Sequence, residues 1–255
     1  MTPFLGSCLM PDYDNLHKLW TKAHATGSPT KFVRDAVVYR ELAKLHPGDT
    51  LDAGAGTGEY SLFLSQRGHK VVAFDPSPYA ARMLADKARD LGIDVETYTS
   101  TIEDFSSSRR FDSIIAIEVI EHIEFDRAAV EKLFSLLKDG GQMVLSTPAT
   151  PFLYSEADRT SGHFRRYRLS VLRELLVHSG FREVQVRRYG FPVLFVYSLA
   201  RKLFLDRILI RHFASETTGS GGKAIAISRL YPHILIADQL NLPFWGVGYV
   251  ATCRK

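Results

Sequence analysis

The sequence of 255 residues predicts an α/β fold in which a parallel sheet is covered on both faces by helices. Short apolar segments alternate with helical segments from residue 50 onward, as in chains that form such sheets. Several of these segments are apolar throughout, as expected of strands buried on both faces. With 45% hydrophobic and 24% charged residues, the composition excludes a disordered chain, a collagen-like repeat and a coiled-coil rod. The length favours a single domain.

Residues 1–48 are predicted to form a helical lid in front of the sheet. Residues 13–24 place Leu16, Trp20 and His24 at a spacing of four, and residues 31–45 are amphipathic. The sequence Pro47-Gly48 then ends the helical pattern.

Residues 49–190 are predicted to form the core of the domain. The expected strands are residues 50–53, 70–75, 94–98, 111–117, 142–147 and 182–189. The expected helices are residues 59–68, 78–92, 127–141 and 169–181. Helices 59–68 and 127–141 end at glycine, which is a common helix stop.

Residues 244–255 are predicted to close the sheet as a last strand, so residues 191–243 form an inserted cap. The cap begins with an uncharged apolar stretch from Phe191 to Ala200, which is too short to span a bilayer. Its continuation to residue 213 is basic and amphipathic. This pattern predicts that residues 191–213 make a peripheral contact with anionic lipid. The alternative is that the segment packs on the sheet or forms a dimer contact.

Charge and cysteine content suggest where the protein works. Residues 1–150 hold 16 Lys and Arg against 21 Asp and Glu, whereas residues 151–255 hold 16 against 7. This excess of basic residues in the second part favours an anionic partner. Two cysteines are too few for a disulfide framework, and the N-terminus lacks the features of a signal peptide, so a cytoplasmic location is expected.

A glycine-rich loop follows the first predicted strand. Asp52 ends that strand, and Gly54, Gly56 and Gly58 precede a helix, so the backbone can approach a ligand closely. The dinucleotide-binding fingerprint requires Gly or Ala where Glu59 stands, which disfavours a dehydrogenase. The loop resembles motif I of the class I S-adenosylmethionine-dependent methyltransferases.

This resemblance covers about residues 30–190 and implies a Rossmann-like seven-stranded methyltransferase fold with S-adenosylmethionine as cofactor. It implies that Asp75 binds both ribose hydroxyls, that Ile117 and Glu118 lie beside the methionine moiety, and that Asp52 belongs to the cofactor loop. The segment that would flank the adenine comprises Thr101, Ile102 and Glu103. Arg34 matches the arginine that binds the cofactor carboxylate in ubiquinone-type O-methyltransferases, and a solvated helix arginine is the alternative.

Glu118, Glu121 and His122 fall at positions i, i+3 and i+4, so they share one face if this turn is helical. The pattern resembles the metal-ligand motif of ubiquinone-type O-methyltransferases and small-RNA 2′-O-methyltransferases, with His163 as the further histidine. Such ligands suit a divalent ion such as Mg²⁺, Mn²⁺, Fe²⁺ or Zn²⁺, which would lower the pKa of a substrate hydroxyl. The alternative is that His122 and His163 are catalytic without a metal, as general bases.

The sequence Gly162-His163-x-Arg-Arg-Tyr167 resembles a motif of uncharacterised bacterial methyltransferases. Arginine binds phosphate or carboxylate through two hydrogen bonds, so Arg165, Arg166 and Tyr167 are predicted to contact the substrate. The alternative is a structural cluster that pairs with the acidic first part of the chain.

Together these features predict O-methylation of a small-molecule acceptor that is anionic or lipid-like. The alternatives are 2′-O-methylation of an RNA end, N-methylation, and a non-catalytic scaffold. Nucleic acid is disfavoured because no RNA-binding module is recognised. The intact cofactor motif disfavours a scaffold, and the oligomeric state cannot be predicted from the sequence.

Overall fold

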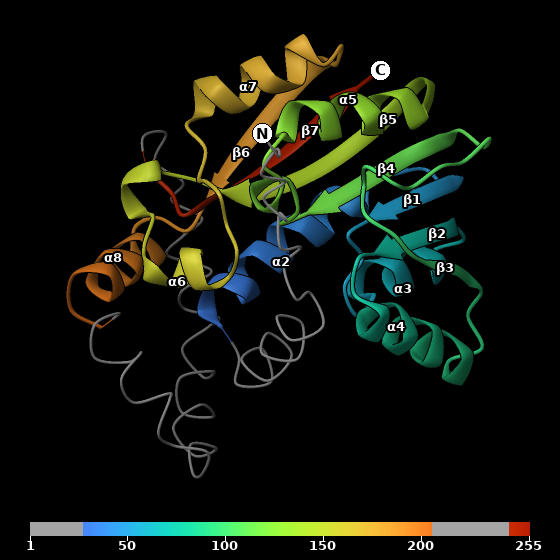
Figure 1. The fold of residues 1–255 in the computed structure, drawn as a ribbon, viewed down its shortest axis with the longest axis horizontal. Helices are drawn as coiled ribbons and strands as arrows, with labels where there is room; N and C mark the ends of the chain where they lie inside the picture. Colours follow the sequence, from blue (N-terminus) through green and yellow to red (C-terminus); the bar gives the residue numbers. More distant parts are fainter. Residues whose placement is uncertain (1–27, 206–244) are drawn as a thin grey trace, which may run out of the picture.

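The computed structural model describes residues 28–205 and 245–255 (Figure 1). The helix expected at residues 13–24 and most of the predicted cap lie outside the described residues. The helices are α2 (Pro29–Leu42), α3 (Glu59–Ser65), α4 (Pro78–Asp90), α5 (Asp126–Leu136), α6 (Glu156–Thr160), α7 (Leu169–His178) and α8 (Val193–Ala200). Short helical turns are η1 (Ile120–His122), η2 (Pro151–Leu153) and η3 (Arg201–Leu205).

The strands are β1 (Asp49–Ala53), β2 (Lys70–Asp75), β3 (Val95–Thr99), β4 (Phe111–Ile117), β5 (Leu137–Pro148), β6 (Arg182–Tyr189) and β7 (Gly248–Arg254). They form one sheet of seven strands in the order β3-β2-β1-β4-β5-β7-β6. The first five in this order are parallel, whereas β7 runs antiparallel to both β5 and β6. Only β7 therefore departs from the parallel sheet predicted from the alternation of strands and helices, and the seven-stranded Rossmann-like fold is confirmed.

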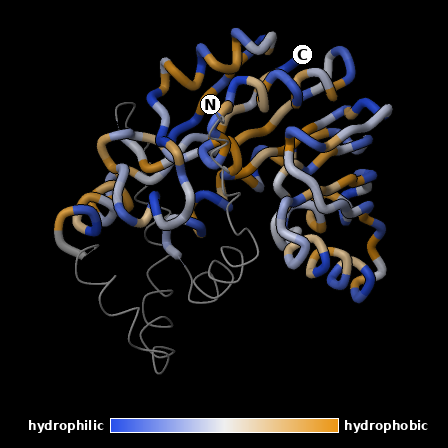
Figure 2. Tube along the Cα trace, in the orientation of Figure 1, coloured by the Kyte–Doolittle hydropathy of each residue, from blue (hydrophilic) through white to orange (hydrophobic). Residues whose placement is uncertain are grey.

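Helices cover both faces of the sheet, as predicted (Figure 1). Side chains of α5 and α7 belong to one buried cluster, and side chains of α2, α3 and α4 belong to another. Strand β4 contributes Ile114 to the first cluster and Ile115 to the second, both fully buried. Figure 2 shows hydrophobic residues gathered along the central strands, whereas α7 alternates between hydrophobic and hydrophilic residues along its length.

One helix boundary differs from the prediction. Helix α5 ends at Leu136, five residues before the predicted stop at Gly141, because Leu137 is already extended and pairs with Phe111 of β4. The glycine at position 140 lies inside the region of β5 with φ of +77°. A sheet contact between distant residues therefore overrides the local helix signal.

The β5–α7 connection (residues 149–168) leaves the sheet and returns to it. Ala149 and Tyr167 form an isolated parallel bridge, so the two ends of the connection lie side by side. The N–H of Thr150 also donates to the carbonyl of Tyr167 at 3.1 Å. The connection carries η2, α6 and His163, and it holds them beyond the carboxyl ends of the strands.

Along the part of the chain that the structure describes, no helix combines the length and the apolarity needed to cross a bilayer.

Candidate functional site

The predicted cofactor motifs follow three adjacent strands. Gly54 follows β1, Asp75 ends β2 and Glu118 follows β4. Because these strands are parallel, their carboxyl ends meet at one edge of the sheet, where open α/β sheets bind ligands. The structure therefore brings the three motifs together at a single edge.

The loop after β1 needs glycine for two reasons. The φ angles of Gly54 and Gly58 are +74° and +85°, in the left-handed region that favours glycine. A Cβ atom at Gly54 would lie 2.7 Å from Cγ2 of Val119, and one at Gly58 would lie 2.1 Å from Cδ1 of Leu84. The conformation and the space around the loop therefore both exclude a larger residue at these positions.

Backbone groups orient the Asp75 carboxylate. Its Oδ2 accepts a hydrogen bond from the N–H of Gly56 at 2.8 Å, and its Oδ1 accepts one from the N–H of Ser77 at 2.9 Å. The residue is only 4% exposed. Its role in binding the ribose hydroxyls stays a prediction, and the structure supplies the oriented carboxylate that this role requires.

Asp52 lies buried beneath the same loop. Its Oδ2 accepts a hydrogen bond from Ser61 Oγ at 2.6 Å. Burial raises the pKa of Asp52 to about 7, the hydrogen bond from Ser61 opposes this shift, and the nearby charge of Asp75 adds to it. Asp52 therefore changes its charge near neutral pH.

The predicted adenine-binding segment follows β3. Ile102 is buried in the core, whereas Glu103 is exposed. Thr101 Oγ1 donates to Asp104 Oδ2 at 2.9 Å and accepts from the N–H of Asp104 at 3.2 Å. This turn therefore holds its own conformation, and the predicted contact with adenine stays a prediction.

Arg34 projects from α2 towards the carboxyl end of β4. Its Nη2 lies 3.0 Å from Asp35 Oδ1, and its Nη1 lies 3.8 Å from Glu118 Oε2. Asp35 Oδ1 also accepts from the hydroxyl of Tyr60 at 2.6 Å. With a side chain only 15% exposed, Arg34 is not the solvated helix arginine of the alternative interpretation.

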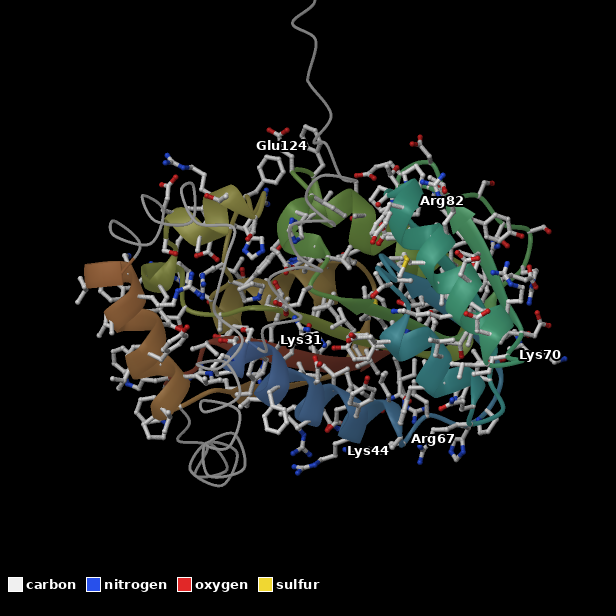
Figure 3. All side chains as sticks on the ribbon, turned by 90° about the horizontal axis from the view of Figure 1, so that it is seen from below. Lys31, Lys44, Arg67, Lys70, Arg82 and Glu124 are labelled. Carbon is white, nitrogen blue, oxygen red and sulfur yellow. The ribbon has the colours of Figure 1, made fainter. Side chains whose placement is uncertain are left out.

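Helix α2 is tied to the cofactor loop by a lysine. Lys31 Nζ lies 2.5 Å from Asp35 Oδ2 on its own helix and 2.5 Å from Glu59 Oε2 at the start of α3. Figure 3, which views the molecule from below, labels Lys31 on α2 and Lys44 just beyond its far end. The start of α2 thus lies against the start of α3, directly after the glycine loop.

The backbone at the end of β4 is strained. Glu118 has a φ of +57°, a conformation that costs a residue other than glycine about 1–3 kcal/mol. Its N–H donates to the carbonyl and to Oγ of Ser146, and its Oε1 accepts from Ser146 Oγ at 2.8 Å. Ile117 before it is buried. These contacts direct the Glu118 carboxylate towards Arg34.

Glu121, His122 and His163 form a cluster in which one possible ligand atom from each lies within 4.8 Å of the others. Glu121 is fully buried, and its Oε2 accepts from Thr147 Oγ1 at 3.2 Å. Burial raises the pKa of Glu121 well above its usual range, and the charge of Glu118 raises it further. Glu118 itself lies outside this cluster, so the predicted set of four metal ligands is reduced to three.

The cluster offers donor atoms of the kinds that bind metal ions, and one of its oxygens has no hydrogen-bond partner. Glu121 Oε1 is buried and has no hydrogen-bond partner. The rings of His122 and His163 lie edge to face, with centroids 4.6 Å apart. One carboxylate and two imidazoles suit a borderline divalent ion. The residues therefore fit a metal ion, and they fit a general base equally.

The three residues predicted to bind substrate differ in their surroundings. Tyr167 is 1% exposed, and its hydroxyl donates to Asp126 Oδ2 at 2.6 Å, so it belongs to the core rather than to a ligand-facing surface. Arg165 Nη1 lies 2.9 Å from the same Asp126 carboxylate. Arg166 Nε lies 2.9 Å from Asp158 Oδ1. Both arginines thus have carboxylate partners inside the domain.

Asp126 and Asp158 are the residues that the sequence analysis did not single out. Asp158 joins Ser155 in a capping box at the start of α6, with the hydroxyl and the carboxylate each bonded to the other residue's backbone. The spacing Ser155-x-x-Asp158 is a sequence signal for this box. Nothing local signals the contacts of Asp126, because they cross from α5 to Arg165 and Tyr167.

Comparisons with known proteins identify the family of the chain. A family model described as a methyltransferase domain matches residues 24–186. The ubiquinone biosynthesis O-methyltransferase of Bradyrhizobium diazoefficiens is 37% identical over 125 residues, covering 46% of the chain and 48% of that relative. The enzyme of the same name from Rickettsia felis is 31% identical over 109 residues, covering 43% of each. The chain thus matches about half the length of these curated relatives.

Solved structures share the fold at low sequence identity. The 1,6-didemethyltoxoflavin-N1-methyltransferase of Burkholderia thailandensis, solved with S-adenosylhomocysteine, has a TM-score of 0.58 and 19% identity, covering 95% of this chain and 83% of that one. A possible histamine N-methyltransferase from Thermotoga maritima has a TM-score of 0.59 and 16% identity, covering 95% and 97%. At such identities the similarity shows the fold alone.

Proposed function

The chain belongs to the family of methyltransferase domains, and from this we propose that it transfers the methyl group of S-adenosylmethionine to a hydroxyl oxygen of a small acceptor. One observation carries the proposal. The glycine loop with Asp75 and the cluster of Glu121, His122 and His163 belong to segments that leave the same edge of the sheet. This arrangement supports a single site in which the first group binds the cofactor and the second accepts a proton.

The residues of the cofactor side have distinct tasks in this proposal. Asp75 binds the ribose hydroxyls, the loop from Gly54 to Gly58 admits the amino-acid end, and Arg34 pairs with the cofactor carboxylate. Ile102 and its neighbours flank the adenine. Each task uses a group that the fold already orients, so little ordering is needed when the cofactor binds.

The acceptor side positions the hydroxyl and removes its proton. The sulfonium of the cofactor supplies a good leaving group, so alignment and deprotonation of the acceptor are the main tasks left to the protein. We assign the deprotonation to His122 or His163, which are both partly exposed. Arg165 and Arg166 are proposed to face an anionic group of the acceptor.

Glu121, His122 and His163 are also proposed as ligands of a divalent ion. Such an ion would lower the pKa of an acceptor hydroxyl. A metal would give the buried Oε1 of Glu121 the partner that it lacks among the protein atoms. Adding a chelator and then restoring single divalent ions separates the two possibilities: activity that is indifferent to the chelator assigns the histidines as general bases.

We favour an oxygen acceptor because the curated relatives quoted above are O-methyltransferases by name.

A lipid-like acceptor is supported by α8, on which Val196 is 61% and Tyr197 38% exposed, and by Arg201 and Lys202 directly after it. Residues 206–213 of the proposed membrane contact lie outside the described residues. Co-sedimentation with anionic and neutral vesicles tests this contact: Arg201→Glu should reduce binding to the anionic vesicles, and equal negligible binding of the unaltered protein to both would exclude it.

The activity itself is tested with a metabolite extract. The protein is incubated with S-adenosylmethionine labelled in its methyl group, and labelled products are identified by mass spectrometry. Calorimetry with S-adenosylhomocysteine and NAD checks the cofactor separately. Binding of NAD without binding of either methionine-derived ligand would overturn the proposal, whereas a labelled amine instead of an ether would replace O-methylation by N-methylation.

A further inference from the structure

Asp158 occupies the centre of the β5–α7 connection and contacts one histidine of the cluster. It is 3% exposed, and its Oδ2 accepts from the N–H of Ser155 at 2.8 Å. Its Oδ1 lies 3.0 Å from His163 Nδ1 and 2.9 Å from Arg166 Nε. A buried carboxylate thus holds the helix start, the histidine ring and the arginine at once.

The backbone of His163 is held by other contacts. Its N–H donates to the main-chain carbonyl of Asp158 at 2.9 Å, and its carbonyl accepts from the hydroxyl of Tyr154 at 2.7 Å. The next N–H, of Phe164, donates to the carbonyl of Glu121 at 2.8 Å. These bonds fix the position of the His163 backbone. The Asp158 side chain then contacts Nδ1, one of the two nitrogens of the His163 ring.

The other partners of Asp158 decide what the ring nitrogen must do. Its Oδ1 is paired with the Arg166 guanidinium and its Oδ2 accepts from the N–H of Ser155, so both oxygens act as acceptors, as in an ionised carboxylate. An ionised carboxylate only accepts hydrogen bonds. The neutral His163 ring must therefore carry its proton on Nδ1 to make this bond, and Nε2 keeps the lone pair.

We propose that Asp158 is a positioning residue that holds His163 in the tautomer with a proton on Nδ1, so that Nε2 is the atom that accepts a proton or binds a metal ion. The same arrangement of carboxylate and imidazole orients histidines in metal sites and catalytic triads. Arg166 then acts on the site through Asp158, because its guanidinium pairs with the carboxylate that orients His163. The effect on turnover rests on the proposed function, but the tautomer does not.

Nitrogen-15 NMR of the full chain labelled at histidine tests the tautomer directly. Spectra are recorded at about pH 8.5, where most histidines are neutral, and His163→Gln identifies the His163 signals. The unaltered protein should show Nδ1 protonated and Nε2 unprotonated. A His163 ring protonated on Nε2 in the unaltered protein would overturn the proposal without any variant.

Two variants separate orientation from folding. Asp158→Asn should shift His163 towards the other tautomer or to exchange between both, because an amide can also donate to the ring. Arg166→Gln removes the other donor to the same oxygen but keeps the carboxylate, so the His163 pattern should persist. His69, whose Nδ1 lies 2.9 Å from Thr50 Oγ1 in the core, reports whether each variant is folded.

Turnover distinguishes a positioning role from a structural one. Asp158→Asn should lower kcat about 10- to 100-fold, as for other partners of functional histidines, with KM for the cofactor unchanged. Asp158→Glu, which restores a carboxylate, should recover part of the loss. An unchanged kcat together with a lost tautomer would overturn the positioning role. If no acceptor is methylated by the unaltered protein, the proposed function fails while the tautomer result stands.

Discussion

The proposed cofactor side and the proposed acceptor side of the site are built by different means. On the cofactor side, the Asp75 carboxylate is bound by backbone N–H groups, that of Ser77 two residues away and that of Gly56 on the loop after the neighbouring strand. On the acceptor side, side chains bind side chains across 41 residues, as in the contact of Tyr167 with Asp126. The first side therefore relies on backbone groups in the loops at strand ends, whereas the second relies on pairs of side chains that meet only when the domain is folded.

The largest effect is expected from crowding the cofactor loop. Gly58→Ala adds a Cβ atom where φ is +85° and where Leu84 Cδ1 would be only 2.1 Å away. We expect a loss of roughly 2–5 kcal/mol in the free energy of unfolding, from backbone strain and overpacking together. Chemical denaturation measures it. Gly92→Ala is the matched control, because φ is +64° but nothing lies within 4 Å, so that only strain of about 1–2 kcal/mol is expected. Equal losses would show that the contact with Leu84 is unimportant.

A smaller effect is expected from removing the carboxylate of the cofactor side. Asp75→Ala should weaken binding of S-adenosylmethionine by about 1–3 kcal/mol, which is the range for hydrogen bonds to a charged group. Calorimetry measures the change in Kd. Asp90→Ala removes an exposed carboxylate from the end of α4 and should leave Kd unchanged. If Asp75→Ala left the affinity for S-adenosylmethionine unchanged, another residue would have to bind the ribose hydroxyls.

The pH dependence of stability tests the buried carboxylate below the loop. The pKa of Asp52 is raised from 3.8 to about 7 in the folded protein, so folding favours the protonated form. This stabilisation is complete below about pH 4 and is lost as the pH rises through about 7. Asp52→Asn stays neutral, so its stability relative to the unaltered protein should increase between about pH 4 and pH 7, by about 1.4 kcal/mol for each pKa unit of the shift. If the free energy of unfolding changed with pH in the same way for both proteins, the raised pKa of Asp52 would be contradicted.

The smallest effect is expected from removing one side-chain hydrogen bond on the acceptor side. Tyr167→Phe removes the hydroxyl that donates to Asp126 but keeps the buried ring. The loss in the free energy of unfolding should be about 1 kcal/mol, the usual contribution of one hydrogen bond. Thermal unfolding detects it. A variant of unaltered stability with a raised KM for the acceptor would instead return Tyr167 to the substrate-binding residues.

The same difference explains which features could be predicted from the sequence. The placement of Gly54, Gly58 and Asp75 at the carboxyl ends of their strands was predicted, because it follows from the strand pattern and local turn chemistry. The end of α5 was not, because the pairing of Leu137 with Phe111 joins residues far apart in the chain. The direction of β7 was not predicted either, since a strand pattern does not reveal which way the strand runs.

The acceptor side shows most clearly what cannot be predicted from the sequence. Arg165, Arg166 and Tyr167 are consecutive, and the sequence treats them alike. In the structure they divide between two carboxylates, with Arg165 and Tyr167 on Asp126 and Arg166 on Asp158. Alternate residues of an extended segment point to opposite sides, so their partners depend on what packs on each side. Only the folded chain determines those partners.

The position of β7 has a consequence for how the protein is made in the cell. Strand β7 follows β6 in the chain but lies between β5 and β6 in the sheet. During synthesis on the ribosome, β5 and β6 therefore emerge well before the strand that joins them. Until residues 248–254 are translated, the edge of β5 stays open, with Val144 and Leu145 among its apolar side chains. An unpaired apolar edge is prone to aggregation, so the nascent protein should depend on chaperones until its last strand is in place.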